Sequence, residues 1–390
     1  MHMKSVCAIH HLFMKRYKFL PGTTGEDRPT LFETICSEEN LTRALYNAAH
    51  NKYRYSEVRF AIDNQDIIIP WIQDNLIYHR FKTSEYHIFK KKEGNKERII
   101  YSLPFLPDRV VQWAIIQVIG PIMERSFIPF TYSSLKGRGP LKCMNQVYHD
   151  MHYDKENTQW CLKIDIQKFY PSIDRYILKL KYRRLFKDDE LLDILDEIID
   201  SPPGDVGIPI GNYISQFSGN LYLSNFDHYI KECSGIKHYY RYMDDMVFLA
   251  DTKERLLDLL DIIKTILEND EHLKIKPNYQ LFDTNKRGVD FVGYVIHHDH
   301  IRVRKSTRNN YRRSTYRILK YKSVSQHSVS QFFSYVGFLR HSNSFNLQCK
   351  YSSDVLKMWN DHKHGIHTYD RRFECRHNLL VYHGGPKAPR

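Results

Sequence analysis

The sequence predicts an α+β fold in which an antiparallel sheet is backed by helices. Short apolar runs of strand length alternate with amphipathic helical segments along most of the chain. With 390 residues, 42% of them apolar, the chain is long enough for two or three subdomains around a substantial core. No Gly/Ser linker or solenoid-length repeat interrupts it, so we expect its parts to pack as one body.

Local patterns place the elements in order along the chain. Apolar residues at three- and four-residue spacing mark helices, and short apolar or alternating runs mark strands. The predicted helices are 41–50, 110–123, 173–184, 187–200, a long helix after Gly211 and a helix from Asp251 with Glu254 in a capping box. The predicted strands are 86–89 and 98–101, joined by a basic loop over 90–96, then 161–166, 238–241, 246–250, 289–296 and 300–303.

The positive charge of the chain is concentrated at one end. Residues 301–390 hold 18 Lys and Arg against four acids, whereas residues 1–300 hold 40 against 41. A solvated face is the simplest explanation of a charged run. Aromatic residues interleave with this one, however, and basic plus aromatic composition is typical of nucleic-acid binding.

Several other classes of protein are disfavoured. No apolar stretch reaches the roughly 18 to 20 residues of a membrane span, and no signal-peptide pattern follows Met1, so a soluble intracellular protein is expected. Seven scattered cysteines without a C-x-x-C pair indicate neither a disulfide framework nor a zinc ribbon. The tail residues His362, His364, His367 and Cys375 have zinc-ligand chemistry, but 21 histidines make chance clustering the simpler explanation.

Three aspartates form the most informative pattern. Asp244 and Asp245 lie at the bend between two predicted strands, flanked by apolar residues and without a neighbouring Lys in the sequence. Two like charges so close repel unless a cation compensates them. An acidic hairpin turn is the alternative, but it would favour Asp-Gly or Asn-Gly. Asp165 ends another apolar strand, and if the strands are neighbours the three carboxylates require divalent cations.

Carboxylates that hold two metal ions roughly 4 Å apart catalyse in-line phosphoryl transfer. Together with the basic, aromatic C-terminal segment, they predict metal-dependent phosphoryl transfer on nucleic acid.

The motifs extend this prediction through a resemblance to a known family. Segment 239–245, YYRYMDD, resembles the catalytic hairpin of reverse transcriptases, and 162–173, LKIDIQKFYPSI, resembles their first palm motif. Further matches follow the family order: the fingers hairpin at 90–100, the helix start LPDRVVQ at 106–112 and the primer-grip hairpin VDFVGY at 289–294. The resemblance implies a right-hand polymerase with an N-terminal helical segment at 1–50, fingers at 51–160, a palm at 161–299 and a basic helical thumb and tail at 300–390.

The resemblance also implies residue roles. Asp165, Asp244 and Asp245 would be catalytic and would ligate two Mg²⁺ ions, which Mn²⁺ can replace, with the Ile166 carbonyl helping. Tyr170 would exclude a 2′-hydroxyl and so select dNTPs, with core packing as the alternative role. The implied nucleotide contacts are Lys91, Arg98, Ile166, Tyr170, Ile210 and Gln216, and Lys276 is a candidate proton donor to pyrophosphate. The implied primer and template contacts are Phe291, Gly293, Tyr294, Arg302, Arg304, Lys305, Arg308, Arg312 and Arg313.

The second palm motif distinguishes between subfamilies. Group II intron enzymes read G-x-P-Q-G followed by S-P, whereas 207–216 reads GIPIGNYISQ. This pattern and the thumb segment 334–344 resemble the reverse transcriptases of diversity-generating retroelements. The Val-Thr-Gly signature of retron enzymes is not present in the sequence, and residues beyond 345 are too few for the maturase extension of an intron protein. A phage-defence reverse transcriptase and a non-catalytic nucleic-acid-binding relative stay open as alternatives.

The subfamily resemblance implies mutagenic retrohoming in a bacterial or phage cytoplasm. Template RNA is copied into cDNA with errors at adenines, and the cDNA replaces a variable region of a target gene. The implied partners are template RNA, cDNA or primer, dNTPs and a small basic accessory protein, with no membrane. Ile210 stands where the wider family has a hydrogen-bonding Gln, so we expect it to tolerate mispairs; packing at a helix entry is the alternative.

Overall fold

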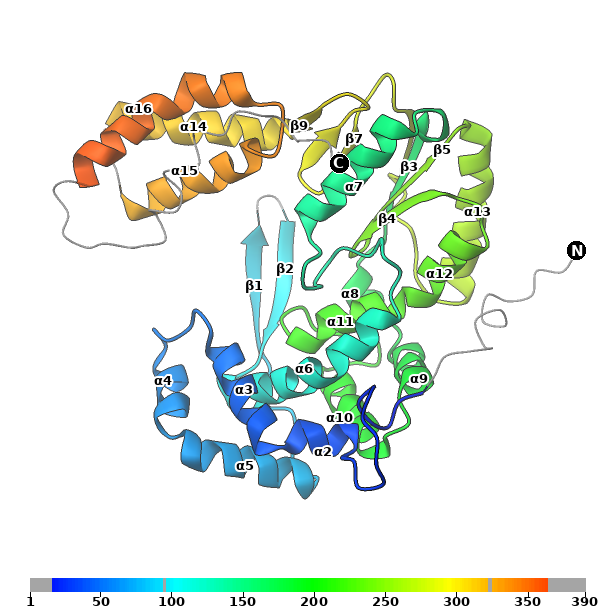
Figure 1. Cartoon of the computed structure of the whole chain (residues 1–390), viewed down its shortest axis with the longest axis vertical. Coiled ribbons are helices and arrows are strands. Elements are labelled where there is room, and N and C mark those ends of the chain that lie inside the picture. The colour runs from blue at the N-terminus through cyan, green and yellow to red at the C-terminus, as the bar shows by residue number, and fades with distance from the viewer. Residues whose placement is uncertain (1–15, 94–95, 322–324, 364–390) are drawn as a thin grey trace, which may run out of the picture. The chain divides into compact units, whose positions relative to one another are not determined.

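The computed structural model describes residues 16–93, 96–321 and 325–363 (Figure 1). Its contacts divide the chain into two compact units, instead of the single body that the sequence predicts. The first unit comprises Met1–Gly137, Lys163–Met246 and Leu257–Tyr279. The second comprises Arg138–Leu162, Val247–Leu256 and Gln280–Arg390. The His-rich tail from 364 onward and the side chain of His362 lie outside the described residues.

Helices open the first unit. They are α2 (Leu31–Cys36), α3 (Glu38–Ala49), α4 (Ser56–Asp63), α5 (Gln65–Ile77) and α6 (Val110–Arg125). A capping box between Thr30 and Glu33 begins α2, and the Ser37 side chain caps α3. The apolar face of α3 packs on α6 and is fully buried at Leu41, Ala44 and Leu45, which forms the core of this region. The helices predicted at 41–50 and 110–123 are thus confirmed.

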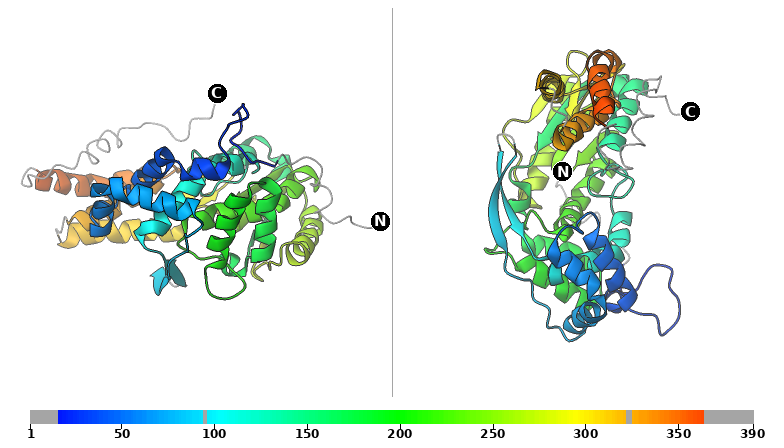
Figure 2. Two further views of the ribbon diagram at one scale, coloured as in Figure 1. Left: turned by 90° about the horizontal axis from the view of Figure 1, so that it is seen from below. Right: turned by 90° about the vertical axis from the view of Figure 1, so that its left-hand side faces the viewer.

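A long antiparallel hairpin joins these helices. Strands β1 (His87–Glu93) and β2 (Lys96–Ser102) pair along their whole length, and Figure 2 shows the hairpin from two sides. The predicted basic hairpin is therefore confirmed, but its strands are longer than expected, because most of residues 90–96 belong to them. Lys91 lies directly opposite Arg98 in the register, and both side chains are exposed. Pairing of backbone groups does not require apolar side chains, which explains why a strongly charged sequence forms strands here.

A four-stranded sheet carries the aspartates. Its order is β4-β5-β3-β6, with β3 (Trp160–Asp165), β4 (His238–Tyr242), β5 (Asp245–Ala250) and β6 (Gln280–Asp283). The helices are α8 (Phe169–Ser172), α9 (Arg175–Leu185), α10 (Asp189–Asp200), α11 (Tyr213–Tyr222), α12 (Ser224–Glu232) and α13 (Lys253–Asn269). The predicted long helix is divided between α11 and α12 at Leu223. Helix α13 begins two residues later than expected, and the Thr252 hydroxyl accepts a bond from the Arg255 amide at 3.4 Å.

The second unit combines a small sheet with helices. It contains α7 (Pro140–Tyr153), the 3-10 turn η3 (Glu156–Thr158), β7 (Val289–Phe291), β8 (Tyr294–Ile296) and β9 (Ile301–Val303). The strand predicted at 289–296 is in fact two strands, because Val292 and Gly293 turn the chain with φ of 43° and 96°. Helices α14 (Lys305–Tyr321), α15 (Gln326–Leu339) and α16 (Phe345–Lys363) follow. The basic segment is therefore helical over these three elements.

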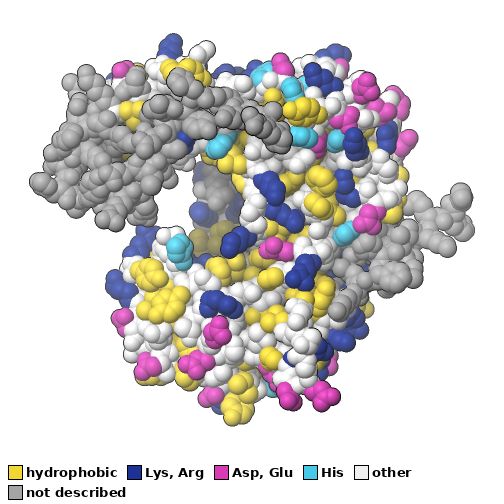
Figure 3. All heavy atoms as spheres, in the orientation of Figure 1, with side chains coloured by type: hydrophobic (Ala, Val, Ile, Leu, Met, Phe, Trp, Pro, Cys, Tyr) yellow, Lys and Arg dark blue, Asp and Glu magenta, His cyan; other side chains and the backbone are white. Residues whose placement is uncertain are grey.

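The charge distribution agrees with the sequence. In Figure 3 acidic side chains lie along the lower edge and also at the upper right, and α10 has the acidic sequence DELLDILDEIID. In contrast, α14 buries Tyr311 and Ile318 and exposes Arg308, Arg312 and Arg313. In the described part of the chain, no helix is both long and apolar enough to span a membrane.

Gly211 provides a test of the fold. Its φ of +135° suits only glycine, and an added Cβ would overlap the carbonyl oxygen of Tyr101 on β2. We predict that Gly211→Ala lowers the free energy of unfolding by about 3 kcal/mol or more, because backbone strain and overpacking add. Gly204→Ala is the matched control, with φ of +83° and open space around its Cβ. It should cost only about 1 to 2 kcal/mol. Urea unfolding measures both, and equal losses would contradict the contact with β2.

Candidate active site

The predicted meeting of Asp165 with the Asp244 turn occurs in the structure. Asp165 ends β3, Asp244 lies in the turn between β4 and β5, and Asp245 begins β5. Strands β3 and β5 are neighbours in the sheet, and the Ile166 amide donates to the Asp244 carbonyl oxygen at 3.4 Å. The turn itself contains Met243 with φ of 57°, an unusual conformation for a residue other than glycine. The sheet thus fixes the spacing of the carboxylates.

Asp165 and Asp244 form a repulsive pair. Burial and then the charge of the neighbouring Asp165, which lies within hydrogen-bonding reach, raise the pKa of Asp244 to about 6. A pair of this kind attracts a cation strongly.

Two lysines from other strands supply positive charge. The Nζ of Lys276 lies 2.5 Å from Asp165 Oδ2, and the Nζ of Lys163 lies 3.3 Å from Asp245 Oδ2. Each lysine is far in sequence from the aspartate that it contacts, so the lack of a neighbouring Lys in the sequence did not mean that no Lys compensates the carboxylates. Lys163 precedes Asp165 by two residues on β3, so both side chains lie on one face of the strand.

Lys276 reaches the site through backbone pairing. The Gln167 amide donates to the Lys274 carbonyl at 2.7 Å, and the Lys276 amide donates to the Asp165 carbonyl at 2.8 Å. Ile166 and Ile275 also form an antiparallel bridge. The segment carrying the candidate proton donor is thus held along the end of β3.

The carboxylates fit a divalent cation in part. Asp165 Oδ1 is buried and has no hydrogen-bond partner, which suits a metal ligand. Asp165 and Asp244 converge, whereas Asp245 pairs with Lys163. Among the residues that the structure describes, no group of three or more His, Cys, Asp or Glu side chains has metal-site geometry. The geometry therefore supports a metal held first by Asp165 and Asp244. Asp245 can join them once its contact with Lys163 is broken.

Arg241 supports the turn between β4 and β5, a role that was not predicted from the sequence. Its guanidinium is fully buried and binds Asp227 through Nε at 2.8 Å and Nη2 at 2.5 Å. Nη1 donates to the Asn220 side chain at 3.1 Å and to the Met243 carbonyl at 3.0 Å. The only signal in the sequence was an Arg within the otherwise apolar and aromatic start of a strand. Arg241 is a positioning residue, since it holds the turn that presents Asp244.

Tyr170 lies beside the aspartates. Its hydroxyl points to Met243 Sδ at 3.3 Å, and burial followed by the Asp244 charge raises its pKa far above the ordinary value. A Cβ on Gly219 of α11 would lie 3.5 Å from the Tyr170 ring, so the ring rests on that helix. The side chain is only partly buried, in contrast to the neighbouring Phe169 at 3% exposure. This position is compatible with the role that the resemblance implies.

The loop before α11 contacts the β1–β2 hairpin. The Ile210 carbonyl accepts a bond from the Tyr101 amide at 3.1 Å, while the Ile210 side chain is partly exposed. Gln112, buried on α6, caps α11 by accepting from the Tyr213 amide at 2.8 Å. Gln216 is exposed on the first turn of α11. Ile210 is thus not a core residue of the described structure.

The predicted primer and template contacts differ in exposure. Phe291 and Tyr294 are 0% and 1% exposed, and Gly293 between them lies against Phe338, so these residues form a packed turn. Arg304 pairs with Asp290, and Arg302 donates to His297. The remaining predicted contacts lie on the exposed face of α14: Lys305, Arg308, Arg312 and Arg313.

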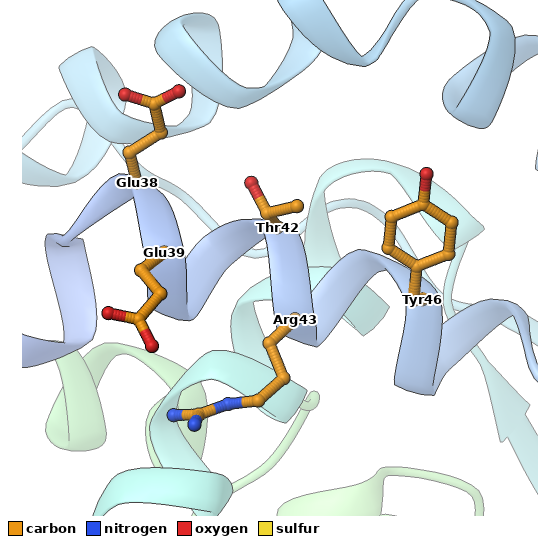
Figure 4. A pocket seen from close by; sticks show the side chains of 5 residues that line it. All are labelled: Glu38, Glu39, Thr42, Arg43 and Tyr46. Atoms are coloured by element: carbon orange, nitrogen blue, oxygen red, sulfur yellow. The ribbon is translucent and has the colours of Figure 1, made fainter.

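A shallow hollow of about 500 Å³ lies along α3 and is separate from these residues. Its lining residues are Glu38, Glu39, Thr42, Arg43 and Tyr46 (Figure 4). In Figure 4 their side chains point to different sides of the helix and do not converge. We assign it no role.

Fold and site together define a class of protein: an α+β domain with paired carboxylates at adjacent strand ends, suited to metal-dependent phosphoryl transfer. The family model described as "Reverse transcriptase (RNA-dependent DNA polymerase)" matches residues 89–296, slightly more than half of the chain. The chain belongs to this family.

Individual relatives are distant. "Protein YkfC" of Escherichia coli (strain K12) is 25% identical over 154 residues, 37% of this chain and 40% of that protein. The match thus spans less than half of the relative. A truncated apo telomerase from Candida tropicalis has 12% identity and a TM-score of 0.43, covering 59% of this chain and 58% of that chain. Telomerase from Candida albicans with a telomeric RNA fragment has 12% identity and a TM-score of 0.44, covering 72% and 58%.

The repulsion at Asp244 predicts a pH-dependent effect on stability. Because the folded-state pKa lies above the unfolded value, the metal-free protein binds an extra proton and loses stability as pH rises from about 4 through about 6. Asp244→Asn should therefore stabilise the metal-free protein at pH 8, by about 3 kcal/mol at most, and the gain should vanish near pH 4. Asp261→Asn, on the exposed face of α13, is the control. Thermal unfolding in chelator across pH measures both, and a pH-independent gain would exclude the repulsion.

Proposed function

We propose that this chain is an RNA-directed DNA polymerase that works by metal-dependent nucleotidyl transfer. The observation that carries the proposal is the Asp165–Asp244 pair, held together at the ends of adjacent strands with lysines at its edges. Two partly buried carboxylates held this close repel each other, which lowers stability unless a cation binds between them. Its membership of the reverse transcriptase family supports the same chemistry.

We assign each residue of the site a separate role. Asp165, Asp244 and Asp245 would hold two Mg²⁺ ions, which, when bound, activate the attacking hydroxyl and stabilise the leaving pyrophosphate. For Asp245 to join them, Lys163 must release it. Lys276 is then the nearest ammonium to the site and is our candidate for protonating the leaving group. Arg241 keeps the turn fixed throughout.

The nucleotide would be bound from two sides. Lys91 and Arg98 lie opposite each other on the hairpin and present two exposed cations suited to a triphosphate. Tyr170, packed on α11 beside Asp244, would meet the sugar and exclude a 2′-hydroxyl. Both assignments follow the family motifs, residue by residue.

Within the family we propose the diversity-generating type. The motif GIPIGNYISQ at 207–216 supports it, and the partly exposed side chain of Ile210 is available to contact a nucleotide. The finer function is then error-prone cDNA synthesis for targeted diversification of a variable gene region, with a small basic accessory protein as partner. A retron-type, intron-derived or phage-defence enzyme remains the alternative within the same chemistry.

Removing one carboxylate tests the catalytic assignment. Asp165→Asn keeps the shape of the side chain but leaves a metal under-coordinated, so primer extension on an RNA template with Mg²⁺ should fall by at least about 10³-fold. Binding of the template should change little, because no template contact is assigned to Asp165. Asp261→Asn provides the control for general effects of losing an acid. Extension at the wild-type rate by Asp165→Asn would overturn the proposal.

Exchanging Ile210 tests the subfamily. An apolar surface discriminates by only about 1 to 3 kcal/mol, whereas a hydrogen-bonding group penalises a wrong substrate that leaves it unpaired. Ile210→Gln should therefore lower misincorporation opposite adenine several-fold, measured by sequencing cDNA from a template with all four bases. Ile210→Val keeps the apolar surface and should keep the error spectrum. An unchanged spectrum in the Gln variant would leave Ile210 a packing role only.

A further inference from the structure

A buried arginine at the start of α9 has no part in the site described above. Arg175 is the first residue of α9 and is only 6% exposed. In the part of the chain that the structure describes, no carboxylate forms an ion pair with it, and the nearby Asp174 and Asp200 pair instead with His272 and Lys179. Burying an arginine charge is costly unless its N–H groups are hydrogen-bonded. The acceptors of these groups therefore indicate what the side chain does.

All the acceptors are backbone carbonyl oxygens at the end of α10 and in the loop that follows it. Nε donates to the Gly207 carbonyl at 2.8 Å, and Nη1 donates to the Gly204 carbonyl at 2.7 Å. Longer bonds of 3.4 Å reach the carbonyls of Pro203 and of Asp200, the last residue of α10. The planar guanidinium can bind several carbonyls at once. One side chain thus holds the loop over 201–207 at both of its ends.

The same loop is hydrogen-bonded to the segment that carries Tyr170. The Gly207 amide donates to the Ile173 carbonyl at 2.8 Å, and the Ile208 amide donates to the Tyr170 carbonyl at 3.0 Å. Gly207 has φ of +91°, and a Cβ added to it would lie 2.8 Å from the Pro171 carbonyl oxygen. The loop and this segment are therefore in direct backbone contact, and Gly207 is bound by both of its neighbours.

The segment with Tyr170 depends on such contacts. It forms α8, a helix of only four residues, and Lys168 before it has φ of 47° and provides no side-chain cap. So short a helix is not stable by itself, because nucleation costs more than one turn of hydrogen bonds returns. Contacts with the loop therefore fix the Tyr170 backbone, and the backbone determines where the ring lies beside Met243 and Asp244.

We propose that Arg175 is a positioning residue for sugar selection. By binding the 201–207 loop it fixes the Tyr170 backbone, and so holds the ring where it excludes a 2′-hydroxyl. The inference rests on the proposed function, since it takes Tyr170 to meet the sugar of the incoming nucleotide. Without the guanidinium, the loop and the Tyr170 backbone can shift together, which opens room for a ribose. A residue that only stabilised the fold would affect ribose and deoxyribose substrates equally.

Primer extension with both types of nucleotide tests this role. On an RNA template with Mg²⁺, kcat/KM is measured for a dNTP and for the matching rNTP, and their ratio is compared between variants. Arg175→Met should lower the ratio at least about tenfold, because a misplacement of about 1 Å can change rates by more than that. Arg183→Met is the matched control, since it removes from the same helix a guanidinium that binds Asp196 at 2.9 and 2.6 Å. An unchanged ratio in Arg175→Met, or an equal fall in the control, would overturn the proposal.

A second variant decides the question if Arg175→Met does not fold. Arg175→Lys keeps the buried charge, but its single ammonium can bind fewer of the carbonyls than the planar fork. In that case its ratio should fall at least about twofold below that of the wild type. A folded Arg175→Lys protein with the wild-type ratio would then exclude the positioning role.

Hydrogen–deuterium exchange tests the contact without relying on activity. In chelator, the amides of Gly207 and Ile208 should exchange at least about tenfold faster in the folded Arg175 variant, with the amides of α6 as the reference for global unfolding. Exchange at the wild-type rate would show that Arg175 does not hold the loop. If the wild-type protein extends no primer, the proposed function itself fails. If it extends a primer and the ratio does not change, only the role of Arg175 is lost.

Discussion

The enforced contact between Asp165 and Asp244 is the constraint on which the rest of the site depends. These two partly buried carboxyls repel each other, and the protein keeps them together because each is fixed by the sheet instead of by its partner. The Ile166–Asp244 backbone bond ties the strand end to the turn, and the fully buried Met246 and Val247 anchor the start of β5. Apolar burial along the strands thus offsets the repulsion at their ends.

The Arg241–Asp227 ion pair also helps to position the turn between β4 and β5. Both side chains are fully buried, so either one alone would be a costly uncompensated charge. Together they leave few polar atoms unsatisfied, because Tyr239 also donates to Asp227 at 2.6 Å. The pair fixes the conformation of the turn, because one guanidinium N–H donates to the carbonyl of Met243, the residue in the unusual backbone conformation. The hydrogen bonds of Arg241 and Asp227 thus hold the turn in its strained conformation, and a single substitution in this network would break it.

Local patterns in the sequence predicted the strands that position the aspartates, because apolar runs of five or six residues have few alternatives in a folded core. They did not predict the lysine contacts. Lys163 could have been predicted at the site, because side chains two residues apart in a strand, such as those of Lys163 and Asp165, lie on the same face. The position of Lys276 could not, because it depends on pairing between segments about 110 residues apart, which no local pattern encodes. The β1–β2 hairpin was predicted too short for a similar reason: its strands are stabilised by backbone pairing, while its charged side chains suggested a loop.

The contact between the β1–β2 hairpin and the loop before α11 joins two parts of the proposed nucleotide site. The Ile210 carbonyl accepts from Tyr101, and Gly211 approaches the Tyr101 carbonyl so closely that only glycine fits. Asn212 then donates to the hydroxyl of Tyr86, the residue before β1, at 2.9 Å. Three consecutive residues therefore contact the base of the hairpin that carries Lys91 and Arg98. Because these contacts are made by the backbone and a short amide, a displacement of the hairpin must also displace Ile210. If Lys91 and Arg98 bind the triphosphate and Ile210 contacts the base pair, as we propose, the two contacts are mechanically coupled.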